Sequence, residues 1–183
     1  MNECYICVDV ETAGPNPADY AMLSIGAVRV DKPEQTFYIE LQPDRDKQTD
    51  EAASIHGLSI EALARDGVAP AKAMQRFAAW LRETCGAHEP VFVAFNAPFD
   101  WMFVNDYFQR YLGSNPFGHR ALDMKALFMG MQGVAWGDTS FHQVSTHYGL
   151  EDRLPHHALE DARLSAELFS AMLSELKEKD YER

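Results

Sequence analysis

The chain has 183 residues, with 28 acidic and 16 basic side chains, so its formal net charge is −12 when histidine is neutral. Its length and its apolar fraction of 46% predict one folded domain over residues 1–183, with a sizeable hydrophobic core. Apolar runs such as Cys4–Val8 and Val91–Phe95 are far shorter than the roughly 20 residues that cross a bilayer, which excludes a membrane span. The first residues lack a basic and apolar leader, so we expect a cytoplasmic protein.

The first part of the chain predicts three strands that are close enough in sequence to form an antiparallel meander. They are Cys4–Val10, Ser24–Val30 and Thr36–Leu41, and the polar segment Asp44–Glu51 after them is expected to be a loop. The odd total of three cysteines does not suit a disulfide framework. Cys4 and Cys7 point to opposite faces of a strand, so we interpret them as core residues rather than zinc ligands.

The second part of the chain alternates helices with two short strands. The predicted helices are Ala69–Cys85, Asp100–Leu112, Lys125–Met131, a segment from Thr139 or Ser140 to Tyr148, and Leu159 to about Lys179. A buried strand is predicted at Val91–Phe95, and a short last strand at Ala121–Asp123. This order is typical of a mixed α/β sheet with helices on its faces.

Two carboxylates stand at the end of the first predicted strand. Asp9 and Glu11 are two residues apart, and residues at that spacing project from the same face of a strand. Acids so close repel each other, and burying them without a cation costs several kcal/mol. A divalent metal ion removes that cost. The alternative is that Val10 is the last buried residue and the pair is simply solvated.

Two further acids and a histidine extend this pattern. Asp100 follows the apolar segment Val91–Phe95 and is either the N-cap of the next helix or a metal ligand, or both. Asp161 lies in the last predicted helix among small residues, and it is either solvated or close to the sheet. His156 stands five residues earlier. Histidine is a natural general base beside a metal site, and a surface position in a loop is the alternative.

The four acids together favour Mg²⁺ or Mn²⁺ over Zn²⁺, because their ligand atoms are hard oxygens. Two such ions about 3.5–4 Å apart are the usual arrangement for displacing an oxygen at phosphorus. The chain is acidic and has no basic run, so it lacks long-range attraction for a polyphosphate. Any nucleic-acid substrate is therefore expected to bind as a short stretch at a local site.

These residues resemble the DEDDh 3′-5′ exonucleases, the group that includes ribonuclease T, oligoribonuclease and the proofreading subunit of the bacterial replicative polymerase. The resemblance rests on five segments in the same order, Asp9–Gly14, Ser24–Val28, Ile55–Leu58, Ala94–Asp100 and His156–Asp161. It implies a ribonuclease H-like α/β fold, with a mixed five-stranded sheet of three antiparallel and two parallel strands flanked by helices. The strands predicted above agree with that fold.

The resemblance also implies a role for each catalytic residue. Asp9 would bridge both metal ions, and Glu11 and Asp161 would complete the catalytic metal site. Asp100 would hold the second ion through water. His156 would deprotonate the attacking water, and the product would be a 5′-mononucleotide.

Four more residues match positions near the terminal nucleotide in this family. Thr12 and His56 match residues that touch it, and Asn96 and Phe99 match residues that shape its pocket. The structural alternatives are that Asn96 orients its loop and that Phe99 belongs to the core.

Two positions depart from the family pattern. Phe95 stands where many relatives have histidine, and His157 stands where arginine or asparagine is frequent. Neither is one of the four acids or the base, so we expect activity to be retained.

The resemblance implies a metal-dependent exonuclease that acts on the 3′ ends of single-stranded DNA or RNA, or on short oligonucleotides. It is compatible with a homodimer, with a stand-alone enzyme and with a polymerase subunit. One alternative is a non-catalytic nucleotide-binding or docking module, which would need a damaged site. Another is a metal-binding protein with no nucleic-acid role, which would not require His156.

Overall fold

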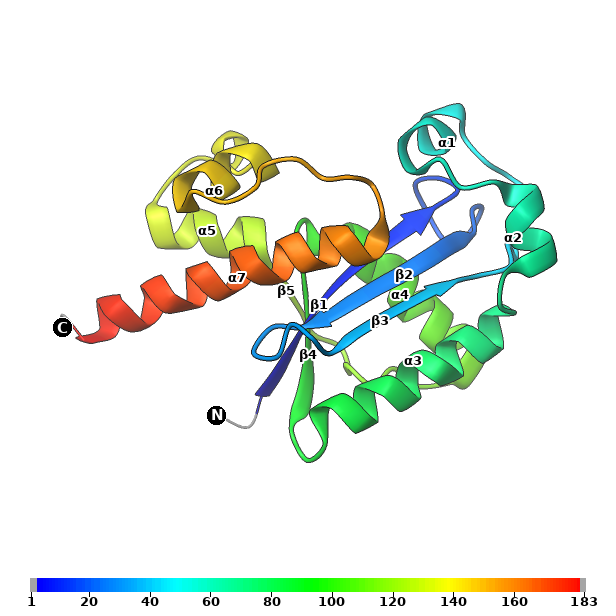
Figure 1. Ribbon diagram of the computed structural model, residues 1–183, viewed down its shortest axis with the longest axis horizontal. Coiled ribbons are helices and arrows are strands. Elements are labelled where there is room, and N and C mark those ends of the chain that lie inside the picture. The colour runs from blue at the N-terminus through cyan, green and yellow to red at the C-terminus, as the bar shows by residue number, and fades with distance from the viewer. Residues whose placement is uncertain (1–2, 182–183) are drawn as a thin grey trace.

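The computed structural model describes residues 3–181 and contains one five-stranded mixed sheet. The strands are β1 (Glu3–Thr12), β2 (Met22–Arg29), β3 (Thr36–Glu40), β4 (Glu89–Ala94) and β5 (Ala121–Asp123). Their order is β3-β2-β1-β4-β5 (Figure 1). β2 pairs antiparallel with β1 and β3, whereas β4 pairs in parallel with β1 and β5. The predicted ribonuclease H-like sheet is therefore confirmed.

Helices cover both faces of this sheet (Figure 1). One face packs against α7 (Ala158–Tyr181), together with α5 (Met124–Gln132) and α6 (Phe141–Tyr148). The other face packs against α3 (Pro70–Cys85) and α4 (Ala97–Leu112). None of the helices formed by the described residues has the length and apolar character needed to cross a membrane.

The alternation of side chains along β1 supplies both hydrophobic layers. Successive residues of a strand point to opposite faces, so Cys4 and Ile6 are buried on the side of α3 and α4, and Cys7 is buried on the side of α7. Both cysteines are core residues with free thiols, as predicted. Asp9 and Glu11 continue the face of Cys7, so the same alternation brings two acids toward α7.

Two short helices were not predicted. They are α1 (Asp50–His56) and α2 (Ile60–Asp66), and a 3-10 helix, η1 (Trp136–Asp138), is also present. The loop predicted for Asp44–Glu51 is wrong at its end, because α1 begins within it. α1 buries no residue and α2 buries only Leu63, so neither carries the apolar periodicity from which a helix is recognised.

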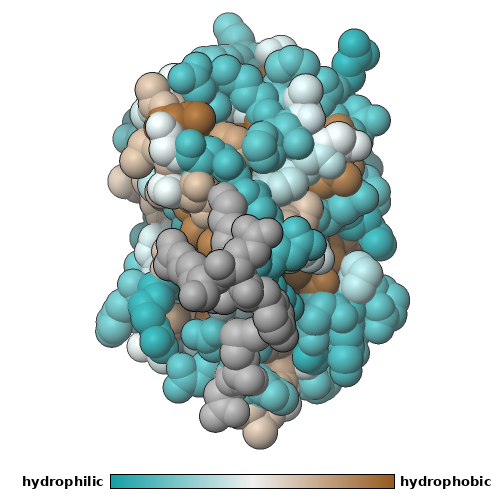
Figure 2. Space-filling view, turned by 90° about the vertical axis from the view of Figure 1, so that its left-hand side faces the viewer, coloured by the Kyte–Doolittle hydropathy of each residue, from teal (hydrophilic) through white to brown (hydrophobic). Residues whose placement is uncertain are grey.

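β1 begins and α7 ends on the left-hand side of the molecule in Figure 1. Figure 2 views that side and shows a mostly hydrophilic surface, with apolar side chains in small separate groups. The end of β1 and the start of α7 lie toward the opposite side. The predicted catalytic residues on these two elements therefore lie away from the start of β1 and the end of α7.

Candidate active site

The end of β1 carries two acids on the face that packs against α7. In the register of the sheet, Asp9 lies opposite Gly26 and Glu11 opposite Ser24 of β2. A Cβ atom at residue 26 would lie 2.1 Å from the backbone oxygen of Ala158, the first residue of α7. Such a contact is not sterically allowed, so α7 can begin directly on the sheet only because residue 26 is glycine.

This close approach brings Asp161, in the first turn of α7, to the acids of β1. One carboxylate oxygen from each of Asp9, Glu11 and Asp161 lies within 4.8 Å of the others. Asp161 is 3% exposed, and its buried Oδ1 has no hydrogen-bond partner among the described residues. A buried polar atom without a partner is costly, so this oxygen fits a position next to a cation.

Asp100 approaches the same strand from α4. The helix begins at Ala97, after Asn96 in the left-handed conformation with φ 65°. Asp100 therefore lies inside the first turn, and the alternative that it is the N-cap is wrong. Its buried Oδ1 accepts a hydrogen bond of 3.1 Å from the backbone amide of Val10. Asp100 is close enough to raise the pKa of Asp9, but it lies outside the cluster of three acids.

Burial raises the pKa of all four carboxyl groups. It raises the pKa of Glu11 to about 7, with a further contribution from Asp161. It raises the pKa of Asp100 to about 8 and that of Asp161 to about 6. Burial, followed by repulsion from Asp100, Asp161 and Glu11, holds the pKa of Asp9 well above its usual range.

These residues fit a divalent cation. Four neighbouring carboxylates can be ionised and buried together at neutral pH only when positive charge balances them. Their oxygens are hard ligands of the kind that Mg²⁺ and Mn²⁺ prefer. Asp9, Glu11 and Asp161 form one group of ligands, and Asp100 stands beside it.

His156 is placed at the edge of this cluster, immediately before α7. The residue is exposed, and its backbone is left-handed with φ 57°. Burial raises the pKa of Asp161, and the nearby His156 partly opposes that rise. The structure thus brings the predicted histidine to the acids while leaving it open to solvent.

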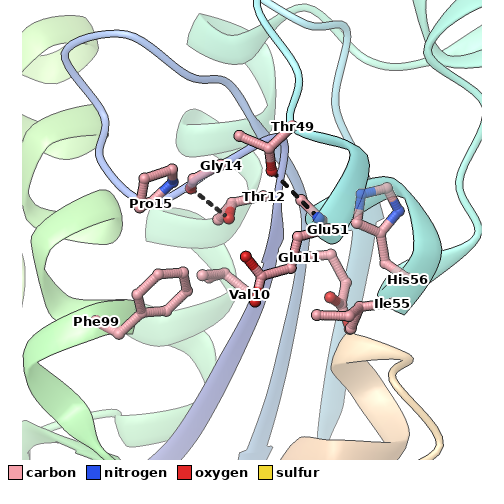
Figure 3. A pocket seen from close by; sticks show the side chains of 11 residues that line it. Val10, Glu11, Thr12, Gly14, Pro15, Thr49, Glu51, Ile55, His56 and Phe99 are labelled. Atoms are coloured by element: carbon pink, nitrogen blue, oxygen red, sulfur yellow. Dashed lines mark hydrogen bonds between the residues drawn. The ribbon is translucent and has the colours of Figure 1, made fainter.

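A cavity of about 350 Å³ opens beside Glu11. Figure 3 shows Phe99 of α4 on one side and His56 and Ile55 of α1 on the other, with Glu11 between them. Thr12 also lines this cavity. Its lining therefore combines aromatic and aliphatic side chains with the acid Glu11, as expected for a site that holds a ligand beside metal ions.

His56, which lines this cavity, carries a hydrogen-bond donor that has no partner among the described residues. Its Nδ1 accepts a hydrogen bond of 2.9 Å from the backbone amide of Leu58, so the proton of the neutral ring lies on Nε2. Burial lowers the pKa of His56, which favours the neutral ring. Nε2 is buried and has no hydrogen-bond partner among the described residues. This atom fits an acceptor on a bound ligand.

Three of the four residues that the family resemblance assigns to the terminal nucleotide line the cavity. They are Thr12, His56 and Phe99, whereas Asn96 is not among the lining residues. The hydroxyl of Thr12 donates a hydrogen bond of 2.9 Å to the backbone oxygen of Gly14. Asn96 is exposed and begins α4 with a left-handed backbone, which agrees with its alternative role of orienting the loop. Its contact with substrate stays a prediction.

Sequence patterns alone did not predict the other lining residues of α1. Glu51 and Ile55 line the cavity, as does Thr49 just before the helix. The sequence did contain a local signal, because Thr49 is followed by two acidic residues. In the structure, the Thr49 side chain accepts a hydrogen bond from the Ala52 amide. Such a residue before an acidic first turn is typical of a helix start.

A polar cluster around Asp44 fixes the connection between β3 and α1. Asp44 accepts hydrogen bonds from the hydroxyls of Tyr107 and Tyr111 at 2.5 and 2.6 Å. It also accepts one from Arg110 at 2.8 Å. All three donors belong to α4, which also carries Phe99 and Asp100. The two walls of the cavity are therefore linked through this cluster.

The sequence matches a known protein family and several curated proteins. The RNase T exonuclease family model matches residues 6–169. The 3′-5′ DNA exonuclease Cap18 of Escherichia coli is 42% identical over 181 residues, which cover 97% of each chain. Ribonuclease T of Vibrio parahaemolyticus is 30% identical over 187 residues, which cover 94% of this chain and 86% of that protein.

The fold matches solved nuclease structures at low sequence identity. The nuclease domain of 3′hExo, described as a DEDDh family member bound to rAMP, has a TM-score of 0.75 and 16% identity, covering 94% of this chain and 92% of that one. An E. coli ExoI complex with single-stranded DNA has a TM-score of 0.71 and 18% identity, covering 94% of this chain and 41% of that one.

Proposed function

Because this chain belongs to the RNase T exonuclease family and is a 3′-5′ exonuclease, we propose that it hydrolyses the last phosphodiester bond at the 3′ end of single-stranded DNA or RNA. The products would be 5′-mononucleotides, and residues 1–183 would act as a single exonuclease domain. One observation carries the proposal. Three buried or half-buried carboxylates have ligand atoms within 4.8 Å of one another, beside a cavity of about 350 Å³.

The four acids would hold two divalent ions, Mg²⁺ or Mn²⁺. Asp9, Glu11 and Asp161 would bind the first ion, since their ligand atoms already lie together. Asp9 and Asp100 would bind the second ion, which agrees with the position of Asp100 outside the cluster of Asp9, Glu11 and Asp161. When bound, the ions would ease deprotonation of the attacking water and neutralise charge on the leaving oxygen.

His156 would act as the general base. It would take a proton from the attacking water, whose oxygen forms the new bond to phosphorus. The bond between phosphorus and the 3′ oxygen of the preceding nucleotide would break, and that oxygen would leave with a proton from solvent. The exposed position of His156 beside Asp161 supports this role, because the ring can release its proton to solvent after each cycle.

The cavity beside Glu11 would hold the terminal nucleotide. Phe99 offers a ring surface on which a base can stack, and the Nε2–H group of His56 offers a hydrogen bond. Thr12 lies beside Glu11 and would contact the sugar or the phosphate. Asn96 would act at the margin of the site, at the start of α4.

The charge of the chain supports a single-stranded or short substrate. Its net charge is −12, and two divalent ions leave it strongly negative, so attraction to a long duplex is weak. A protein with a similar fold is described in a complex with single-stranded DNA. The two relatives above are named as a DNA exonuclease and as a ribonuclease, so both types of strand belong in the test.

The test uses 5′-labelled single-stranded DNA and RNA oligonucleotides and a blunt DNA duplex, with Mg²⁺, Mn²⁺ or chelator. We expect a ladder that shortens from the 3′ end of single strands, 5′-mononucleotides as products, and loss of the reaction with chelator. Asp9→Asn is the inactive control.

If the single strands stay intact while the protein binds metal, the proposal is wrong, and a non-catalytic docking module becomes the better description. A ladder that shortens equally in the Asp9→Asn variant would indicate a contaminating nuclease.

A further inference from the structure

The backbone of His156 has an unusual conformation that its surroundings must maintain. Its φ of 57° lies in the left-handed region, which residues with a side chain adopt at an energetic cost. The residue is exposed, and its backbone, like that of His157, forms a hydrogen bond to Asp161. The position of this ring therefore depends on the backbone contact with Asp161 and on the residues that follow it in the chain, His157 and Ala158.

Three residues that lie side by side on neighbouring strands explain where His157 and Ala158 are held. Asp9 of β1, Gly26 of β2 and Tyr38 of β3 lie opposite one another in the register, and directly opposed residues point to the same face. The backbone of Ala158 occupies the space left open by Gly26. The start of α7 is therefore seated between Asp9 on one side and Tyr38 on the other.

His157 stacks on Tyr38 at this place. The two ring centroids are 4.6 Å apart, and the ring planes are inclined by 23°. The Tyr38 hydroxyl donates a hydrogen bond of 2.8 Å to Glu40. The backbone oxygen of His157 accepts a hydrogen bond of 3.0 Å from the amide of Asp161. Residue 157 thus connects β3, the acid Asp161 and the proposed base.

We propose that Tyr38 and His157 are positioning residues whose stacked rings hold His156 in place beside the acids. This inference rests on the proposed function, because it assigns His156 the role of base. It also gives a physical reason for His157, one of the two positions where the chain departs from the family pattern. The competing explanation is that the stack only stabilises the start of α7.

The experiment compares His157→Ala and Tyr38→Ala with the aromatic variants His157→Phe and Tyr38→Phe, which keep a ring at each position. We expect each alanine variant to lower kcat by about 10-fold or more, since small displacements of a catalytic group have large effects on rate. KM and the affinity for Mn²⁺ should change by less than about twofold, because no metal ligand is altered. The aromatic variants should recover most of the lost rate.

Tyr5→Ala is the matched control. Tyr5 lies on the same face of the sheet and contacts Phe169 of α7 with ring centroids 5.3 Å apart, but it stands at the opposite end of β1. This variant should lower the melting temperature and leave kcat unchanged. If Tyr5→Ala and Tyr38→Ala reduce kcat equally, the stack has only a structural role and the inference is overturned.

The proton resonances of the His157 ring provide a readout that does not depend on activity. Stacking on Tyr38 should shift them, and Tyr38→Ala should remove that shift. Unchanged resonances in Tyr38→Ala would show that the two rings do not stack. His157 is exposed, so we expect His157→Ala to fold, and an unchanged kcat in this variant would contradict the positioning role of His157. An inactive wild-type chain would instead overturn the proposed function, and the positioning role with it.

Discussion

Asp161 shows at the scale of one residue how this site departs from an ordinary protein interior. Its carboxylate is buried, one oxygen has no protein partner among the described residues, and burial raises its pKa to about 6. Buried acids in a stable core are normally paired with a donor or a cation. The energetic cost of burying the Asp161 carboxylate indicates that this acid has a function. The neighbouring acids support metal binding as that function.

Asp161→Asn should lower the exonuclease rate by more than about 1,000-fold, because metal ions contribute several kcal/mol to stabilising the transition state. The measurement is single-turnover cleavage of a 3′ nucleotide. Glu160→Gln is the matched control, since this neighbouring acid is exposed and forms an ion pair of 3.5 Å with Arg163. Equal rates for the wild type and Asp161→Asn would show that Asp161 does not take part in catalysis.

His56→Ala should act mainly on substrate binding. The variant removes a donor that has no protein partner among the described residues, so we expect KM to rise by about 10-fold, the cost of one hydrogen bond to a charged or polar ligand. kcat should change little, since His56 is not one of the acids or the base. His119→Ala, an exposed histidine just before β5, is the control. An unchanged KM in steady-state kinetics would contradict the assignment of His56 to substrate.

At the scale of elements, the site depends on how closely α7 lies on β2. Gly26→Ala would add a Cβ atom 2.1 Å from the backbone oxygen of Ala158, so α7 must shift and carry Asp161 away from Asp9. We expect a loss of about 1–3 kcal/mol in the free energy of unfolding and a loss of activity. Thermal denaturation and the cleavage assay measure the two effects.

Gly130→Ala is the matched control for this element. A Cβ atom at Gly130, in α5, meets nothing within 4 Å. The substitution should leave activity unchanged and stabilise the helix slightly, because alanine has the higher helix propensity. Comparable losses in Gly26→Ala and Gly130→Ala would show that the contact between α7 and β2 is not the cause.

The sequence predicted those elements whose pattern is local. The alternation along β1 and the helical spacing of α7 indicated both elements and their acids before any contact was known. Asp100 was identified as a candidate, but its place inside α4 depends on the left-handed Asn96, which spacing does not reveal. The stack of His157 on Tyr38 joins residues far apart in the chain, and one sequence carries no signal for such a contact.

At the scale of the whole molecule, the ionisation of the buried carboxyl groups links the stability of the fold to metal binding. Glu11, Asp100 and Asp161 have folded-state pKa values of about 7, about 8 and about 6, all above their values in an unfolded chain. The metal-free fold therefore gains most from these groups while they are protonated, below pH ~4, and loses that gain as the pH rises through the range of their folded-state values. Bound cations remove the energetic cost of ionising these buried carboxyl groups.

The melting temperature of the metal-free protein should accordingly contain a component that falls between about pH 5 and pH 8. Asp100→Asn lacks one of the titrating groups, so its melting temperature should fall less over the same range. Mg²⁺ or Mn²⁺ should raise the melting temperature of the wild type more at pH 8 than at pH 6. A metal effect that is independent of pH, or equal pH profiles for the two proteins, would contradict this account.

The account divides the site into acids that bind metal and a histidine that moves a proton. One paired measurement on His156→Ala tests this division most directly, by Mn²⁺ titration calorimetry and by single-turnover cleavage of the same preparation. We predict that metal affinity stays within about twofold of the wild type, while the rate falls by about 100-fold or more, the usual contribution of a general base. A variant that keeps its rate, or one that loses metal together with its rate, would contradict the account.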